Sequence, residues 1–294
     1  MSTFVILPCL DSEQMAASRR RELDLSRYAA PSLGRSALEA IRKGCYVTSA
    51  GQEVSWRDAV QAACAAKRSI DPDFTLPSNE RIPFPETKVQ VTNETTLGAS
   101  LRLVKRGLRP LALNFANGIH PGGGFLGGAR AQEEVLCRSS ALYETLVDDP
   151  MYKEHRKRPQ PDSTDWAIYS PDVPVFRIDD GTPLQHFWLL SVITCAAPYA
   201  PVIGQQRSGD FLKKRIHRVL AIARSYGYNA LVLGAWGCGA FHNDPHRTAA
   251  DFRDALANDF SGAFSDIVFA ITDWSQERRF LGPFREAFAV NVHT

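Results

Sequence analysis

The sequence predicts an α/β protein with a mostly parallel sheet that is covered by helices on both faces. Segments of strand and helix character alternate along most of the chain, and two apolar strands each run into a glycine-rich turn that is followed by a helix. The composition, with 44% hydrophobic and 22% charged residues, is that of an ordinary globular protein. With 294 residues, the chain is long enough for one large domain with an extension.

Residues 1–85 are expected to form a mainly helical N-terminal extension that covers a main domain at 86–294. The plain composition of the extension indicates a structural role. Its residue pattern predicts helices at 14–24, 33–43 and 58–67, a hairpin at 45–56 and an extended linker at 69–85.

Strands and helices alternate in the main domain. Hydrophobic runs predict strands at 88–92, 111–115, 187–195, 229–233 and 267–271. Amphipathic spacing predicts helices at 96–105, 132–146, 210–226, 245–258 and 276–288. The run 187–195 is almost continuously apolar, which predicts a strand covered on both faces. The connection 148–184 is long and polar and contains a strand or hairpin within 166–177.

The first glycine-rich turn follows the strand 111–115. Three successive glycines allow a close backbone approach to a ligand, and a helix start supplies free N–H groups that attract anions. Two carboxylates at the same helix start therefore indicate chemistry beside an anion site, although the spacing alone also fits a tight turn before an ordinary helix. The segment contains Gly122, Gly123, Gly124, Gln132, Glu133 and Glu134.

The second glycine-rich turn follows the strand 229–233. Ligands of open α/β sheets bind outside the carboxyl ends of the strands, so two such turns at one sheet edge could hold the two phosphates of a diphosphate. Phe241 could equally fill the edge of the core, and Cys238 fits loop packing better than a nucleophile, because no His–Asp pattern accompanies it. The turn contains Gly237, Cys238, Gly239, Ala240 and Phe241.

Charge and cysteine content narrow the function classes. The net charge of +2 is too balanced for a duplex nucleic-acid interface. The six cysteines form no C-x-x-C pair, and we expect them to be reduced in a cytoplasmic protein. No apolar run approaches the length of a membrane span, and no secretory signal is expected. His242 and His246 lack a third ligand at a metal-binding spacing, so no metal is expected.

The first turn resembles the signature of poly(ADP-ribose) glycohydrolases, in which three glycines, seven residues and Gln-Glu-Glu follow one another. The residues 114–117 and Pro121 resemble the microbial-type branch of that family, and 237–241 is similar to its second phosphate loop. The resemblance implies a three-layer α/β/α macrodomain-like fold that binds ADP-ribose, and it makes 86–294 the catalytic domain. It implies neither a metal nor another cofactor.

The two adjacent carboxylates must have different roles, because neighbouring residues of a helix point about 100° apart. The resemblance implies that Glu134 is the acid and base that cleaves the glycosidic bond. It implies that Glu133 and Asn117 hold hydroxyls of the scissile ribose, that Gln132 sets the loop, and that Phe241 packs on the sugar.

The expected function is hydrolysis of ribose–ribose O-glycosidic bonds in poly(ADP-ribose), with exo action that releases ADP-ribose. A non-catalytic ADP-ribose reader is a second hypothesis, which the glutamate pair disfavours. A third is a glycohydrolase of mono-ADP-ribosylated protein or nucleic acid, which the sequence does not distinguish from the first. The expected partners are ADP-ribose and its polymer, also when attached to protein, and the chain is expected to be a monomer.

Overall fold

The computed structural model describes residues 3–26, 28–79 and 82–289. Its large sheet has eight strands in the order β1-β5-β10-β9-β6-β8-β7-β4. Every neighbouring pair from β1 to β8 is parallel, and the last two pairs are antiparallel. The strands are β1 (Thr3–Ile6), β4 (Arg68–Ile70), β5 (Glu86–Thr92), β6 (Pro110–Ala116), β7 (Ala167–Arg177), β8 (Pro183–Ala196), β9 (Ala230–Leu233) and β10 (Asp266–Ala270).

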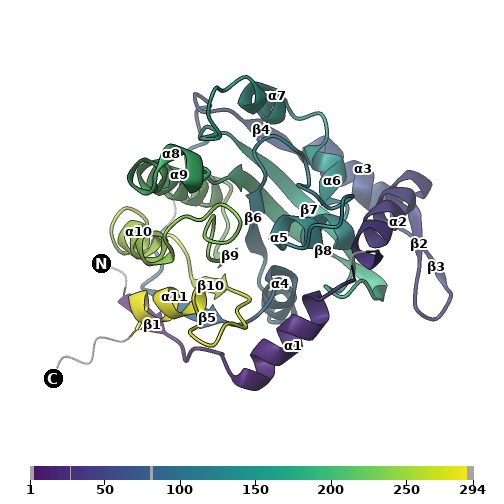
Figure 1. Ribbon diagram of the computed structural model, residues 1–294, viewed down its shortest axis with the longest axis horizontal. Coiled ribbons are helices and arrows are strands. Elements are labelled where there is room, and N and C mark those ends of the chain that lie inside the picture. Colours follow the sequence, from purple (N-terminus) through teal and green to yellow (C-terminus); the bar gives the residue numbers. More distant parts are fainter. Residues whose placement is uncertain (1–2, 27, 80–81, 290–294) are drawn as a thin grey trace.

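Helices cover both faces of this sheet, so the predicted fold class is confirmed (Figure 1). One core lies between the sheet and α9 (Gln205–Ser225), α10 (Pro245–Ala257) and α11 (Leu281–Ala287). The opposite core includes α2 (Ala29–Lys43), α3 (Arg57–Ala66), α4 (Thr96–Lys105), α5 (Gln132–Ser139), α6 (Leu142–Leu146) and α7 (Pro150–Arg156). The remaining elements are α1 (Glu13–Leu23), α8 (Ala200–Ile203) and the hairpin of β2 (Cys45–Val47) and β3 (Glu53–Ser55).

The first 85 residues contain the predicted helices and hairpin, and they also supply both edge strands of the large sheet. β1 pairs with β5 at one edge, and β4 pairs with β7 at the other. The sequence did not indicate these strands, because four and three residues are too few to show a period. The extension is therefore integrated into the sheet as well as packed on it.

The helix predicted at 132–146 is wrong as a single helix. It is divided into α5 and α6 at Ser140 and Ala141. The Ser140 side chain accepts a hydrogen bond from the Leu142 N–H group, and the Ala141 N–H group donates to the Pro174 carbonyl oxygen of β7. Because these bonds replace helical ones, α5 is a short, separately anchored helix.

Three further expectations need correction. The connection 148–184 contains α7, which begins at Pro150 with the Asp149 side chain as its cap. The strand β8 is covered on both faces only from Leu190 onward, and Leu189 is 45% exposed. The last helix begins only at Leu281, because the Asp273 carboxylate accepts hydrogen bonds from the Phe280 and Leu281 N–H groups and holds 273–280 as a loop.

Candidate active site

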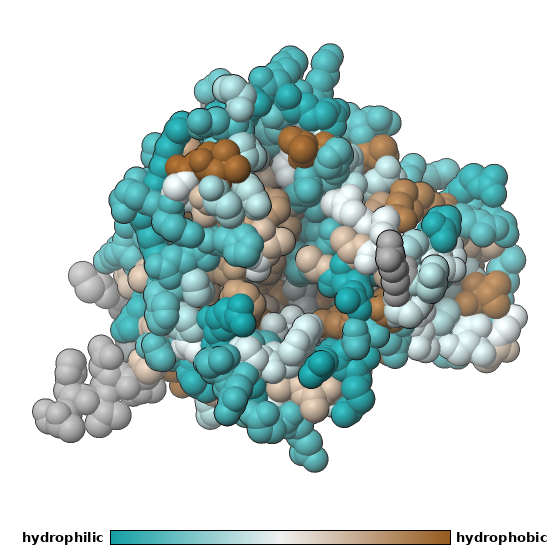
Figure 2. All heavy atoms as spheres, in the orientation of Figure 1, coloured by the Kyte–Doolittle hydropathy of each residue, from teal (hydrophilic) through white to brown (hydrophobic). Residues whose placement is uncertain are grey.

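A cavity of about 760 Å³ lies at the carboxyl ends of the parallel strands. It is lined by the start of α5 and by the segments that follow β5, β6, β9 and β10. Figure 2 shows less hydrophilic residues recessed near the centre of this face, with hydrophilic residues around them. The cavity therefore lies at the sheet edge where the two glycine-rich turns were expected to meet.

Glu133 is held on both carboxylate oxygens. Its Oε2 accepts a hydrogen bond from the Asn117 N–H group at 2.7 Å, and its Oε1 accepts one from Asn114 Nδ2 at 3.3 Å. Burial raises the pKa of Glu133 to about 8, and the charge of Glu134 adds to this increase. The raised pKa means that Glu133 binds a proton more readily than an ordinary glutamate does.

Glu134 is held on one oxygen only. Its Oε1 accepts a hydrogen bond from the Gly124 N–H group at 2.9 Å. Its Oε2 is buried and has no hydrogen-bond partner among the described residues. An unpartnered buried polar atom costs about 1–3 kcal/mol, and a hydrogen bond from a substrate would remove this cost. Oε2 of Glu134 is therefore the oxygen of the pair that is available to a substrate.

The N–H groups of the first glycine turn are bonded to acceptors within the protein. The Gly124 N–H group is taken by Glu134, and those of Gly123 and Phe125 donate to carbonyl oxygens of the same loop. Gly122, Gly123 and Gly124 do not line the cavity. The expectation that this turn offers free N–H groups is therefore wrong for Gly123 and Gly124, whose N–H groups are already bonded within the protein. Gly122 and Gly123 have φ values of 70° and 58°, which explains the glycines.

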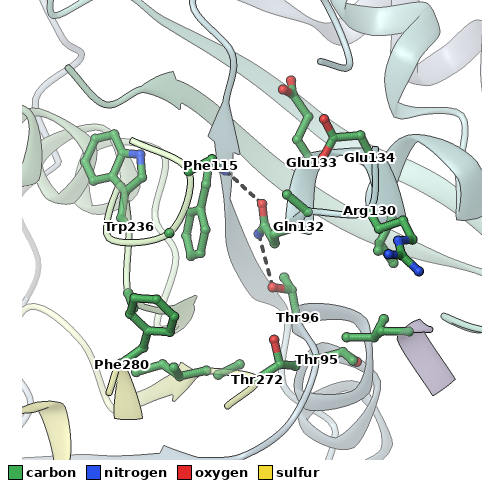
Figure 3. Close-up of a pocket in the computed structure, with 18 of the residues that line it drawn as sticks. Thr95, Thr96, Phe115, Arg130, Gln132, Glu133, Glu134, Trp236, Thr272 and Phe280 are labelled. Atoms are coloured by element: carbon green, nitrogen blue, oxygen red, sulfur yellow. Dashed lines mark hydrogen bonds between the residues drawn. The ribbon is translucent and has the colours of Figure 1, made fainter. Parts of the chain in front are cut away.

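Gln132 fixes the start of α5 to the end of β6 (Figure 3). Its Oε1 accepts from the Phe115 N–H group at 2.9 Å, while its Nε2 donates to the Leu113 carbonyl oxygen and to Thr96 Oγ1 at 2.7 and 3.1 Å. The carboxamide is thus engaged at both ends, which favours the predicted loop-setting role.

Asn117 lines the cavity beside the glutamates. Its Oδ1 accepts hydrogen bonds from the Ile119 and His120 N–H groups, both at 3.0 Å, so the side chain closes a turn at 117–120. The backbone N–H group of the same residue holds Glu133. Asn117 therefore couples this turn to the carboxylate pair.

The second glycine turn presents free donors to the cavity. Gly237, Gly239, Ala240 and Phe241 line it, and the N–H groups of Gly239, Ala240 and Phe241 have no partner in the part of the chain that the structure describes. Cys238 does not line the cavity, because its thiol is buried, and burial raises its pKa to about 12. Its N–H group donates to the Ala235 carbonyl oxygen. Cys238 therefore packs inside the loop and does not contact the cavity, which agrees with the loop-packing interpretation of this residue.

Phe241→Ala is expected to impair hydrolysis more than folding. Phe241 lines the cavity and is only partly buried, with its ring edge-on to Tyr199 at 5.8 Å between centroids. Loss of a side chain that positions the sugar should reduce kcat/KM roughly 10-fold or more, since small misplacements are costly. Melting curves and initial rates test this. Collapse of the melting temperature with full turnover in the remaining folded enzyme would make Phe241 a core residue.

Several lining residues were not predicted. Thr95 and Thr96 follow β5, and Thr272 and Trp274 follow β10. Ligands of open α/β sheets bind outside the carboxyl ends of the strands, so this rule would have located these residues if it had been applied to every predicted strand. Figure 3 places Trp236 and Phe280 across the cavity from Glu133 and Glu134. Leu23 of α1 also lines it, and nothing in the sequence signalled that contact.

Among the described residues, no group of three or more His, Cys, Asp or Glu side chains could hold a metal ion. The six cysteines are free. No described helix combines the length and apolar character that a membrane crossing requires.

Comparisons with known proteins show the family of this chain. A family model described as "Microbial-type PARG, catalytic domain" matches residues 34–178. The crystal structure of poly(ADP-ribose) glycohydrolase from Thermomonospora curvata is 37% identical and covers 89% of this chain and 100% of its own, with a TM-score of 0.83. The chain belongs to the microbial-type poly(ADP-ribose) glycohydrolase family. The family predicted from the sequence is thus confirmed.

Two related structures contain ligands. The Thermomonospora curvata glycohydrolase bound to the inhibitor ADP-HPD is 36% identical to this family member and covers 88% of this chain and 99% of its own, with a TM-score of 0.81. The glycohydrolase from Deinococcus radiodurans in complex with ADP-ribose is also 36% identical and covers 85% and 96%, with a TM-score of 0.66. A search of curated proteins finds no match.

Proposed function

We propose that this glycohydrolase cleaves the ribose–ribose O-glycosidic bond at the end of poly(ADP-ribose) chains and releases ADP-ribose, with Glu134 as the general acid and base. The observation that carries the assignment is the asymmetry of the carboxylates. Glu133 has both oxygens engaged by nitrogen donors, whereas Glu134 Oε2 has none among the described residues. Exo action rests on the family resemblance.

The reaction begins with a proton transfer to the leaving ribose oxygen. Glu134 donates this proton as the bond to the anomeric carbon breaks, and positive charge develops on the scissile sugar. Glu134 then takes a proton from the attacking water, which returns the carboxyl group to its starting state. Because Oε2 is closed off from solvent, the Glu134 side chain or the residues around it must move before the substrate reaches this oxygen.

The other residues bind and orient the substrate. The free N–H groups of Gly239, Ala240 and Phe241 suit phosphate oxygens, and α5 begins at the cavity without a side-chain cap, which also favours an anion. A diphosphate held by these N–H groups lies close to the positive charge that develops on the scissile sugar. Glu133 and Asn117 hold ribose hydroxyls, and Phe241 packs on the sugar.

Residues 86–294 act as the macrodomain-like catalytic domain in this proposal, and residues 1–85 support it. The residues used above come from one chain, so the site does not need a second copy and a monomer suffices. The six free cysteines are what a cytoplasmic protein would contain. Its partners are ADP-ribose and the polymer, free or attached to protein, without direct binding of duplex nucleic acid.

The function is tested by a panel of substrates in a buffer that contains a chelator. Poly(ADP-ribose), mono-ADP-ribosylated protein and ADP-ribosylated DNA are incubated with the enzyme, and released ADP-ribose is quantified over time. We expect single ADP-ribose units from the polymer at the earliest time points, with the chelator present. If ADP-ribose is released only from the mono-ADP-ribosylated substrates, the polymer is not the substrate. Activity that requires an added divalent ion would contradict the metal-free mechanism.

A further inference from the structure

A polymer substrate extends beyond the bond that is cleaved, so the enzyme needs a surface for the next unit. This inference rests on the proposed function. The terminal ADP-ribose occupies the cavity, and its scissile end lies beside Glu133 and Glu134. The chain must leave past the residues that border the cavity at that end. Two of these borders are the turn at 117–120 and Phe241.

One border is anchored to α7. His155 Nδ1 lies 3.0 Å from the Gly118 carbonyl oxygen, and Arg156 Nη1 donates to the Ile119 carbonyl oxygen at 2.7 Å. The Thr164 N–H group donates to His155 Nε2, so Nδ1 carries the proton and donates to Gly118. The guanidinium of Arg156 is therefore fixed against the turn that holds Glu133.

The second border, at Phe241, is connected to α9. Arg207 Nη1 donates to Gln160 Oε1 at 2.9 Å, and its guanidinium lies over the Phe211 ring at 5.3 Å. The carbonyl oxygen of the following residue, Pro161, accepts from the Tyr199 N–H group at 3.0 Å, and Tyr199 packs against Phe241. Arg207 is thus linked through one short chain of contacts to the second border of the cavity.

These arginines keep their charge available. Their recorded hydrogen bonds go to a carbonyl and a carboxamide oxygen, and neither forms an ion pair within the described residues. The neighbouring cations are different, because Lys157 pairs with Glu154 and Arg158 pairs with Asp162, each at 2.6 Å. Arg156 and Arg207 are both exposed. Figure 2 shows hydrophilic residues over the top of this face, where Figure 1 places α7.

We propose that Arg156 and Arg207 form a subsite for the diphosphate of the ADP-ribose unit that follows the scissile bond. A guanidinium matches phosphate oxygens in geometry and charge, and each unit of the polymer carries one diphosphate. The subsite would select polymer over a single ADP-ribose on a protein side chain, because only the polymer places a diphosphate there. It also gives a role to the basic segment 155–158, whose other cations are neutralised.

The test uses Arg156→Gln, Arg207→Gln and the double variant. We expect the double variant to lose roughly 3- to 10-fold in kcat/KM on poly(ADP-ribose) at low salt, mainly through KM, as exposed phosphate contacts are individually modest. The salt dependence of kcat/KM should become shallower. The affinity for free ADP-ribose should stay unchanged in calorimetry, since that ligand fills only the cavity. Arg156→Lys keeps the positive charge. Its KM for the polymer should therefore be closer to the wild-type value than that of Arg156→Gln.

Arg42→Gln is the matched control, because Arg42 is an exposed arginine of α2 that does not line the cavity. Wild-type kinetics and salt dependence in the double variant would overturn the subsite. A parallel loss of ADP-ribose affinity, or a loss that Arg156→Lys does not restore, would also overturn it, because the arginines would then support the structure of the site. Wild-type enzyme that fails to cleave polymer would refute the proposed function instead.

Discussion

Glu134→Gln is expected to reduce turnover on poly(ADP-ribose) by at least about 10²–10⁴-fold, the usual contribution of general acid and base catalysis. Gln keeps the size of Glu and can still accept the hydrogen bond from the Gly124 N–H group at the position of Oε1. It cannot donate or take a proton as a carboxyl group does. The affinity for ADP-ribose should therefore remain close to that of the wild type, as measured by calorimetry.

Glu133→Gln is the matched comparison and should behave differently. Glu133 accepts from two nitrogen donors, and an amide has only one acceptor oxygen, so one of these bonds is lost. The proposed role of Glu133 is to accept hydrogen bonds from ribose hydroxyls, and loss of one charged hydrogen bond to the ribose would cost about 1.5–3 kcal/mol, or roughly one to two orders of magnitude in affinity. Some turnover should survive, because the amide oxygen of Gln can still accept one hydrogen bond from a ribose hydroxyl. Full activity in Glu134→Gln would refute the assignment, and equal partial losses would mean that the two residues share the role.

Gly123→Ala is expected to reduce kcat/KM by roughly 10²-fold or more, because it displaces both carboxylates. A Cβ atom at this position would overlap Glu134 Oε1 and lie 3.1 Å from Glu133 Oε2. The φ of 58° also costs a non-glycine residue about 1–2 kcal/mol. A displacement near 1 Å at a catalytic group can cost that much activity. Initial rates and thermal melting together separate the catalytic loss from the loss of stability.

Gly127→Ala is the control from the same loop. A Cβ atom at Gly127 would meet only the Gly124 carbonyl oxygen at 3.5 Å, an ordinary contact, and this glycine has no positive φ. We expect near wild-type activity in this variant. If both variants lose activity equally, general mobility of the loop matters rather than the contact of Gly123 with the glutamates.

The sequence predicted those parts of the protein that have a local pattern. Alternating apolar residues located the central strand β6, a short apolar run located β9, and the glycine turns after these strands located the site. Adjacent glutamates on one helix required different roles, and the structure holds Glu133 and Glu134 by different partners.

The remaining features depend on contacts between distant segments. β1 and β4 are too short to show a period and form only because an edge of the sheet is available. The break between α5 and α6 depends on Pro174 of β7. The first glycine turn was expected to bind phosphate, but its Gly124 N–H group points to Glu134, a side chain ten positions away. No periodicity rule predicts such pairings.

The central claim is that Glu134, and not Glu133, acts on the glycosidic oxygen. A crystal structure of Glu134→Gln with a dimer of ADP-ribose tests it most directly, since the variant should bind without cleaving. We predict that the side-chain amide at position 134 lies within about 2.6–3.2 Å of the glycosidic oxygen, while Glu133 contacts ribose hydroxyls. Glu133 at the glycosidic oxygen, with position 134 directed away from it, would contradict the account.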